Sequence, residues 1–438
     1  ELGEEGAVDQ HTMFSSASTT KAFTTAALGM LVDEGKLEWD DRVIDVLPGF
    51  RLYDPYVTRE VTVRDLVTHR TGQAGGGALW YGSENAREDV VELLRYQEPA
   101  SSFRSEYAYN NNMFAVAGEV LEAVSGESWA DFVRERILEP LDMDRTIMLI
   151  SELPSYDNVA QPHDVIDGEL QPIRFLDFDN IGPAGSMMSN VEDMTHWLSF
   201  HLAGGVVNGE RLLSEEVHEE LFTPQTIVPA ESFYPAAELA GTNFRAYGLG
   251  WFLQDYRGHK LVMHTGSIDG MTALTAMLPE KDVGMIVFIN RDHSELRHAL
   301  MYRVMDAYIG GPPRDWSAEV HALFPEDNSD GGREDDRVAG TQPSLPLADY
   351  AGVYEHQMYG DIEVTQEGGG LVLAREPQWT GPLSHRHYNT FQVDWNDPVF
   401  GTDLVTFQLN ARGEVASLVL GGTGEFERVE DDSEGGTR

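Results

Sequence analysis

The period of the hydrophobic pattern changes twice along this chain, and these changes constrain its fold more than any other feature. Over the first two hundred residues apolar side chains recur at helical spacing, most clearly at 90–96, 113–124, 129–138 and 191–202. From Tyr247 to Asn290 the pattern becomes β-rich, with runs at 248–256, 260–264, 271–278 and 283–290. An antiparallel meander with a closing helix at about 294–309 is predicted, and an α+β layered domain fits this order best.

The second change follows an acidic, glycine-rich stretch. Residues 325–344 lack an apolar period, which indicates a linker. Short strand-like segments then appear at 352–354, 362–365, 371–374, 391–395, 404–409 and 416–420, a pattern typical of a small β-barrel or sandwich. We therefore predict a domain at 1–324, the linker at 325–344, a β-domain at 345–430 and a disordered tail at 431–438.

Length and composition bound the class of protein. With 438 residues, the chain is longer than a single hydrophobic core usually supports, so we expect two domains. Its 41% hydrophobic content is enough to form a core in each of them. No run of about 18 apolar residues occurs, so we predict no membrane span. The N-terminal Glu-Leu-Gly-Glu-Glu does not resemble a signal peptide. Because the sequence contains no cysteine, disulfides, thiolate zinc sites and a cysteine nucleophile are excluded.

The net charge is strongly negative. Acidic residues number 74 against 30 basic ones, which gives −44, and such a field repels nucleic acid and anionic membranes. Solubility alone needs far less charge. At about 1 M salt the Debye length falls to roughly 3 Å, which screens the self-repulsion. We therefore expect adaptation to high salt and favour the cytoplasm of a salt-accumulating halophile, with export as the alternative because the N-terminus looks incomplete.

Three short motifs bear groups suited to nucleophilic catalysis: Ser18-Thr19-Thr20-Lys21, Tyr109-Asn110-Asn111 and His264-Thr265-Gly266. A serine hydroxyl is a poor nucleophile unless a basic group lies within hydrogen-bond reach. Residues three apart share a helix face, so Ser18 and Lys21 would meet on the first turn of a helix that ends near Gly35. The helix dipole and burial would both lower the pKa of Lys21 there. Alone, a Ser-x-x-Lys pair is weak evidence.

Taken together and in this order, the motifs resemble the serine β-lactamase and penicillin-binding-protein superfamily, specifically its class C-like branch of esterases, D-aminopeptidases and alkaline D-peptidases. The resemblance covers most of residues 11–310 and extends to Thr12-Met13-Phe14, Leu66-Val67-Thr68-His69, Gly182-Pro183-Ala184-Gly185 and Tyr247-Gly248-Leu249-Gly250-Trp251. The C-terminal stretch, with Tyr350-Ala351-Gly352-Val353-Tyr354, Tyr359-Gly360 and Phe391, resembles the lipocalin-like barrel of some members. In those relatives the barrel borders the active site of its own or a neighbouring subunit, so a homo-oligomer is an open alternative.

The resemblance implies a serine hydrolase without metal or cofactor that acts through an acyl-enzyme on Ser18. It implies that Lys21 and Tyr109 share the base role, with the phenol kept acidic by the amine and by His264. Which of the two removes the serine proton stays open.

Substrate-binding roles are implied in the same way. Asn111 would hold the acyl side chain or Lys21, and the backbone N–H groups of Ser18 and Ser267 would form the oxyanion hole, beside Thr265 and Gly266.

One substitution within the resemblance bears on the substrate. His264 stands where β-lactamases and transpeptidases usually carry lysine, and an imidazole is mostly neutral near pH 7, so recognition of a substrate carboxylate should weaken. We expect small esters and short or D-amino-acid peptides as substrates, with weak β-lactam hydrolysis. The alternative is a catalytically silent penicillin-binding or sensor-like protein that is acylated or binds ligand without turnover.

The resemblance also has a gap. Relatives carry a helix and two strands of the central sheet before the nucleophile, whereas only seventeen residues precede Ser18 here. Either the sequence is truncated or processed, or another segment completes the sheet.

Overall fold

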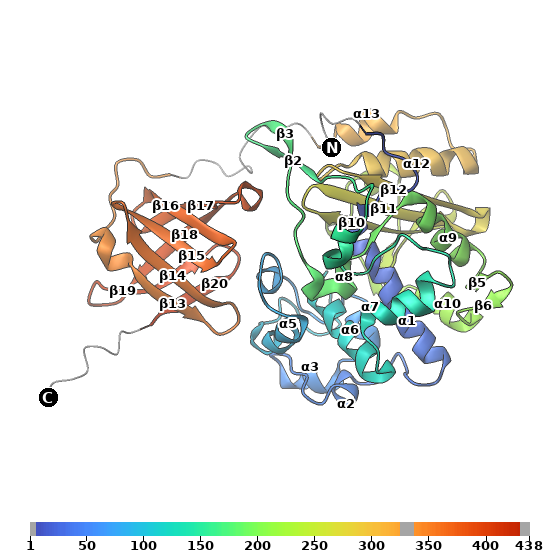
Figure 1. The fold of residues 1–438 in the computed structure, drawn as a ribbon, viewed down its shortest axis with the longest axis horizontal. Coiled ribbons are helices and arrows are strands. Elements are labelled where there is room, and N and C mark those ends of the chain that lie inside the picture. The colour runs from blue at the N-terminus through green and yellow to red at the C-terminus, as the bar shows by residue number, and fades with distance from the viewer. Residues whose placement is uncertain (1–5, 325–336, 430–438) are drawn as a thin grey trace. The chain divides into compact units, whose positions relative to one another are not determined.

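The computed structural model describes residues 6–324 and 337–429, which separate into two units (Figure 1). The first unit comprises residues 6–75 and 86–324, and the second comprises 76–85 and 337–429. Residues 337–344, the described part of the predicted linker, contain no helix or strand. Residues 325–336 of that linker and the predicted tail at 431–438 lie outside the described residues.

A six-stranded antiparallel sheet forms the centre of the first unit. Its strands are ordered β12 (Val283–Ile289), β11 (Met271–Leu278), β10 (His259–Ile268), β9 (Phe252–Tyr256), β8 (Arg245–Tyr247) and β7 (Thr226–Ile227). The predicted antiparallel meander is confirmed. The run predicted at 260–264 is only half of β10, because pairing with β11 carries this strand through Gly266 to Ile268.

Helices lie on both sides of this sheet (Figure 1). On one side lie α12 (Leu296–Ile309) and α13 (Trp316–His321), which share an apolar core with the strands. In this core Met301, Tyr302 and Trp316 are buried with Met263 and Leu274. On the other side lie α1 and its neighbours. The helices are α1 (Lys21–Asp33), α2 (Val43–Val46), α3 (Pro55–Glu60), α4 (Val63–Leu66), α5 (Arg87–Leu93), α6 (Asn112–Ser125), α7 (Trp129–Val133), α8 (Gly182–Gly185), α9 (Val191–Leu202), α10 (Glu215–Leu221), α11 (Ala236–Leu239), α12 (Leu296–Ile309) and α13 (Trp316–His321).

Helix α1 runs through the interior of the unit. Every residue from Lys21 to Leu31 is buried, which is the expected state of a helix that is apolar on all faces. Gly29 permits close packing, since a Cβ there would overlap the side chain of Val217 on α10. A buried α1 provides a rigid base for the residues at its start.

The edge strand β12 pairs with β11 alone among the described residues. The remaining strands of the first unit form two-stranded pairs: β1 (Phe14–Ser15) with β4 (Met188–Ser189), β2 (His163–Ile166) with β3 (Glu169–Pro172), and β5 (Val206–Val207) with β6 (Glu210–Arg211). Within the described part of the chain, therefore, no other segment extends the sheet beyond β12.

The second unit contains a closed barrel of eight antiparallel strands, as the C-terminal pattern predicted. Its strands are β13 (Gly352–His356), β14 (Gly360–Glu367), β15 (Gly370–Glu376), β16 (Trp379–His387), β17 (Thr390–Asp394), β18 (Thr402–Leu409), β19 (Val415–Leu420) and β20 (Gly424–Arg428). The sequence analysis missed β16 and β20. Gly381 and Pro382 interrupt the strand pattern of β16, yet Pro382 pairs with Val372 and its side chain points to solvent.

Residues 76–85 belong to the second unit although they lie far from it in sequence. The indole N–H of Trp379 donates to the carbonyl oxygen of Tyr81 at 3.2 Å, and Arg375 donates to that of Ala78 at 2.6 Å. Two features favour glycine at residue 82. Its φ is +60°, and a Cβ there would overlap the rings of Trp379 and Phe400.

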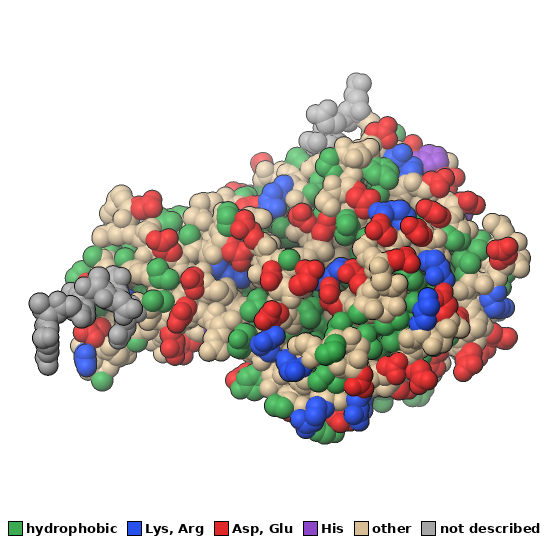
Figure 2. All heavy atoms as spheres, turned by 60° about the horizontal axis from the view of Figure 1, so that its bottom comes forward, with side chains coloured by type: hydrophobic (Ala, Val, Ile, Leu, Met, Phe, Trp, Pro, Cys, Tyr) green, Lys and Arg blue, Asp and Glu red, His purple; other side chains and the backbone are tan. Residues whose placement is uncertain are grey.

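The excess of acidic residues in the sequence is visible on the surface of the protein. In Figure 2, acidic side chains are spread over the visible face instead of being gathered in one patch. Among the described residues no helix combines the length and apolar character needed to cross a membrane.

Candidate active site

Ser18 and Lys21 meet at the start of α1, as their spacing predicts. Ser18 lies in a 3-10 turn (Ala17–Thr20) that leads directly into the helix, and its Oγ is 2.9 Å from Lys21 Nζ. The preceding Ala17 has φ +43°, a left-handed conformation that a non-glycine residue adopts only when its surroundings hold it there. Ser18 remains half-buried, so its hydroxyl is accessible from a pocket, whereas Lys21 is fully buried.

The Lys21 amine has two further partners, both of them oxygen acceptors. It donates to Asn111 Oδ1 at 2.7 Å and to the carbonyl oxygen of Ala184, on α8, at 2.8 Å. Burial without a carboxylate partner lowers the pKa of Lys21 well below its ordinary value, because the ammonium form loses its hydration. Burial therefore shifts this amine toward its neutral form, in which it has a lone pair for a proton.

Tyr109 approaches the same two groups. Its hydroxyl hydrogen bonds to Ser18, and Lys21 Nζ lies 5.0 Å from the centre of its ring. Burial raises the pKa of this phenol well above its ordinary value. The expectation that the amine and His264 keep the phenol acidic is wrong, because desolvation dominates the pKa of Tyr109 and neither of those groups contributes to lowering it.

His264, on β10, lies behind the pocket and is fully engaged. Its Nδ1 donates to the carbonyl oxygen of Thr265 at 2.6 Å, and its Nε2 accepts from the Tyr247 hydroxyl at 2.9 Å. Burial, with a smaller contribution from Lys21, lowers the pKa of His264 to about 3. The imidazole is therefore neutral at physiological pH, as the substitution for lysine predicted.

Two residues that support this cluster were not predicted as part of the site. Asn110 donates through its side chain to Gly75 and accepts from the N–H of Met113, which fixes the start of α6. His69 accepts from the N–H of Asn110 at 3.1 Å, and its ring packs 4.2 Å from that of Tyr109. The signal for His69 was the Leu-Val-Thr-His string, which suggested no role by itself.

Strand β10 forms one edge of the site. Thr265 Oγ1 lies 2.5 Å from the hydroxyl of Tyr234. Arg297, on α12, is 4% exposed and donates to the carbonyl oxygen of Gly266 at 2.7 Å and to Ser267 Oγ at 2.8 Å. The sequence analysis missed Tyr234 and Arg297, because neither belongs to a motif and only tertiary packing brings them to the strand.

A pocket of about 590 Å³ opens onto Ser18. Five of the eight predicted site residues line it, namely Ser18, Tyr109, Asn111, Thr265 and Ser267. The other three, Lys21, His264 and Gly266, belong to the same contact network behind its wall. The remaining lining residues are Tyr107, Glu231, Ser232, Phe233, Tyr234, Pro235, Phe252 and Arg297.

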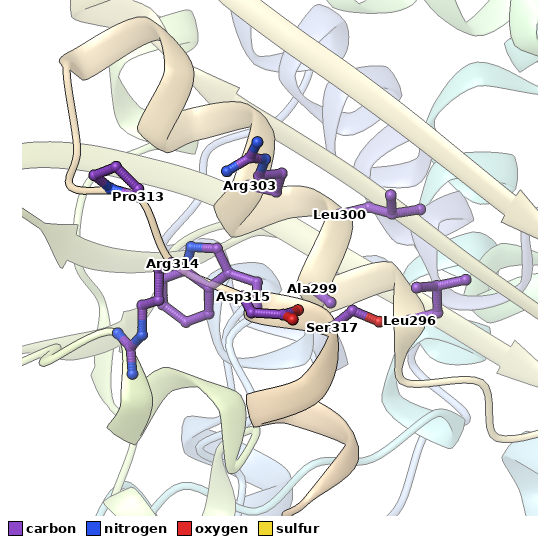
Figure 3. Close-up of a pocket in the computed structure, with 9 residues that line it drawn as sticks. Leu296, Ala299, Leu300, Arg303, Pro313, Arg314, Asp315 and Ser317 are labelled. Carbon is purple, nitrogen blue, oxygen red and sulfur yellow. The ribbon is translucent and has the colours of Figure 1, made fainter.

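A second pocket, of about 570 Å³, lies between α12 and α13. Figure 3 shows its lining, in which Leu296 and Leu300 come from α12 and Asp315 and Ser317 from the start of α13. No lysine, histidine or tyrosine is among these residues, so Ser317 has no amine, imidazole or phenol beside it in the lining of this pocket. Among the described residues, no cluster of three or more histidine, aspartate or glutamate side chains could hold a metal ion.

Comparison with known proteins agrees with this fold. The beta-lactamase family model matches residues 1–308, so the chain belongs to the beta-lactamase family, a family of serine hydrolases. A domain of unknown function, DUF3471, matches residues 336–434 and so includes the barrel. The predicted membership of the β-lactamase and penicillin-binding-protein superfamily is thereby confirmed.

Two curated relatives carry functional names. The chain is 28% identical to unguisins hydrolase ungD of Aspergillus violaceofuscus over 402 residues, which cover 83% of this chain and 70% of that protein. It is 28% identical to penicillin-binding protein 4 of Amycolatopsis lactamdurans over 300 residues, which cover 65% and 74% of the two chains.

Two solved structures share the fold. An octameric penicillin-binding protein homologue from Pyrococcus abyssi matches with a TM-score of 0.62 at 22% identity, covering 96% of this chain and 89% of that one. The D-amino acid amidase of Ochrobactrum anthropi SV3 matches with a TM-score of 0.58 at 21% identity, covering 70% and 86%.

Proposed function

We propose that this chain hydrolyses small esters and short or D-amino-acid peptides, and β-lactams weakly, through an acyl-enzyme on Ser18. The observation that carries the proposal is the 2.9 Å approach of the half-buried Ser18 hydroxyl to a fully buried amine whose pKa is lowered by desolvation. Such a pair is what a serine needs in order to act as a nucleophile. The names of the hydrolase and amidase relatives agree with this chemistry.

The hydrogen-bond partners of Lys21 support it as the base in this proposal. A neutral amine has two N–H donors and one lone pair, and Lys21 Nζ has two carbonyl acceptors and one hydroxyl as partners. When Asn111 and Ala184 accept the two N–H groups, the lone pair faces the Ser18 O–H. Tyr109 has no comparable means of becoming a base, because burial keeps its phenol protonated.

The proposed reaction has two steps, acylation of Ser18 and hydrolysis of the acyl-enzyme. Lys21 takes the Ser18 proton as Oγ attacks the substrate carbonyl carbon, and the proton passes through the Tyr109 hydroxyl to the leaving alcohol or amine as its bond to carbon breaks. Water then attacks the acyl-Ser18 ester, giving its proton to Lys21, and the free acid departs as Ser18 recovers a proton. In both steps the N–H groups of Ser18 and Ser267 stabilise the oxyanion.

The proposal is tested with a fluorophosphonate probe and a chromogenic short-chain ester. We expect phosphonylation of Ser18, located by peptide mapping, and ester turnover that Ser18→Ala abolishes. Ser317→Ala is the matched control, since this exposed serine lines the second pocket, between α12 and α13, where no lysine, histidine or tyrosine accompanies it. Equal turnover by Ser18→Ala and the unchanged protein would contradict the assignment of the nucleophile. Labelling without turnover of any ester, peptide or β-lactam would instead support the silent, sensor-like alternative.

We also propose that copies of this chain associate. The proposal is supported by the octameric relative from Pyrococcus abyssi, whose fold covers nearly the whole chain. Light scattering coupled to size-exclusion chromatography tests it, and a monomer at all salt and protein concentrations would contradict it.

A further inference from the structure

Charge is sparse in the lining of the Ser18 pocket. Of its thirteen lining residues only Glu231 and Arg297 carry an ionisable acid or a permanent cation, and aromatic rings supply much of the rest. A charged substrate entering this pocket loses much of its hydration, so the availability of those two groups decides which charge it can carry.

Arg297 is not available to an anion. Its guanidinium donates to Gly266 O and Ser267 Oγ, and it pairs with Glu295 at 3.0 Å. With 5% of its side chain exposed and its charge balanced by that carboxylate, Arg297 stabilises the edge of β10. Three protein oxygens engage the two outer nitrogens of Arg297, and its Nε–H, which has no partner among the described residues, is buried away from the pocket surface.

The other anion-binding groups at this edge are also engaged. His264 has both ring nitrogens in hydrogen bonds and is neutral. The Thr265 hydroxyl pairs with that of Tyr234, which leaves one proton of the two hydroxyl groups for a ligand. A carboxylate near the scissile bond would therefore find hydroxyl and backbone donors, but no free cation.

Glu231, in contrast to Arg297, carries a charge that no neighbouring group balances. It lies on the exposed loop before α11, lines the pocket, and makes no hydrogen bond or ion pair with any other described residue. Its carboxylate is therefore the one uncompensated charge in the lining of the pocket. Such a charge attracts a cationic group and repels an anionic one over several ångströms.

We propose that the Ser18 pocket selects substrates by charge, with Glu231 as the specificity-determining residue, so that it accepts cationic or uncharged esters and amides and rejects those with a carboxylate near the scissile bond. The inference rests on the proposed function and names the substrate class of that site. It assigns an ammonium group, such as the free amine of an amino-acid derivative, to the neighbourhood of Glu231.

Three aryl acetates test this selectivity. Their leaving phenols carry a carboxylate, a carboxamide or a trimethylammonium group at the meta position, and each kcat/KM is divided by the rate constant for hydroxide hydrolysis. We expect the ammonium ester to exceed the carboxylate ester by about tenfold or more. In Glu231→Gln this ratio should fall severalfold, and in Glu231→Lys it should approach or pass below one.

Glu238→Gln is the matched control, because it removes the same charge from an exposed residue of α11 that does not line the pocket. The ratio should be unchanged in this variant. An equal fall in Glu238→Gln and Glu231→Gln would overturn the role of Glu231, since the long-range field of the acidic chain would then be responsible. Turnover of the carboxylate ester as fast as the carboxamide ester would overturn the selectivity itself.

Charge selectivity and hydrolysis at Ser18 are contradicted by different results. If Ser18 is phosphonylated and all three esters are hydrolysed without charge preference, the charge selectivity is wrong and the hydrolase assignment stands. If Ser18→Ala hydrolyses the esters as fast as the unchanged protein, the proposed function is wrong and the selectivity falls with it.

Discussion

Gly266 lies against the carbonyl oxygen of Ser16, so closely that a Cβ at residue 266 would overlap this oxygen. Strand β10 and the segment that presents Ser18 therefore meet backbone to backbone. This close approach is consistent with the proposal that the N–H groups of Ser18 and Ser267 form one oxyanion hole.

Gly266→Ala should therefore damage the site and the fold together. We expect a fall in kcat/KM of at least tenfold and a loss of about 1–3 kcal/mol in the free energy of unfolding, since the backbone oxygen cannot yield as a side chain would. Ester kinetics and chemical denaturation measure the two effects. Gly49→Ala is the control, because no atom lies within 4 Å of its Cβ position and its φ is not positive. Normal activity and stability in Gly266→Ala would contradict the close approach.

The pH profile should distinguish the two candidate bases. Because burial lowers the pKa of Lys21, kcat/KM should rise with pH through that lowered pKa and then level off. Tyr109→Phe should reduce kcat by about 10²-fold, through loss of proton transfer, and leave the midpoint of the rise unchanged. Lys21→Met should abolish turnover. A rise that disappears in Tyr109→Phe would show that the phenol is the base.

A buried histidine pair should make the fold sensitive to acid. His201 Nδ1 lies 3.2 Å from His218 Nε2, and burial lowers the pKa of His201 well below 6.5 and that of His218 to about 4. The unfolded chain then binds more protons than the folded one between pH 6.5 and 4, so stability falls as pH falls through this window. The contribution of His218 is about 2–3 kcal/mol at the lower end.

Denaturation of the His218→Gln variant at pH 7.5 and 4.5 measures this contribution. The difference in unfolding free energy between the two pH values should be smaller in His218→Gln than in the unchanged protein. His321→Gln, at an exposed histidine of α13, should leave the difference as it is. A pH dependence that His218→Gln does not reduce would exclude the pair as its source.

Salt should stabilise the chain strongly. The net charge of −44 destabilises the compact state in dilute buffer, and molar salt screens this repulsion. We expect the thermal midpoint to rise by about 10 °C or more between 0.1 and 2 M KCl, which differential scanning fluorimetry measures. Sucrose of equal osmolality is the control for effects other than screening. A midpoint independent of KCl would contradict adaptation to high salt.

Strong local periodicity gave accurate predictions where one element buries a continuous apolar surface. The helix predicted at 191–202 and the strand predicted at 271–278 coincide with α9 and β11. The predictions were poorer where partners outside the segment decide the structure. Strand β10 continues through Thr265 and Gly266, which look like a turn in sequence, because β11 pairs with them.

The same distinction holds for the site. Spacing alone placed Ser18 beside Lys21, since three residues of helical backbone fix that distance. Spacing could not give the protonation of Tyr109, because a pKa depends on burial and on charges contributed by other elements. Spacing also could not predict that Arg297 belongs to the site, because Arg297 lies thirty-one residues after Gly266, on another element, and donates to its carbonyl oxygen.

The amino-acid sequence by itself therefore determined the order of the two units and the approach of Ser18 to the Lys21 amine, because local periodicity and short-range spacing are properties of the chain. Tertiary structure decided the pKa values of the site and which groups are already occupied: burial lowers the pKa of Lys21 and of His264, and Arg297 is paired with Glu295. The physical reason is that hydration and hydrogen-bond partners are set by whatever packs around a side chain, and packing joins residues that are remote in sequence.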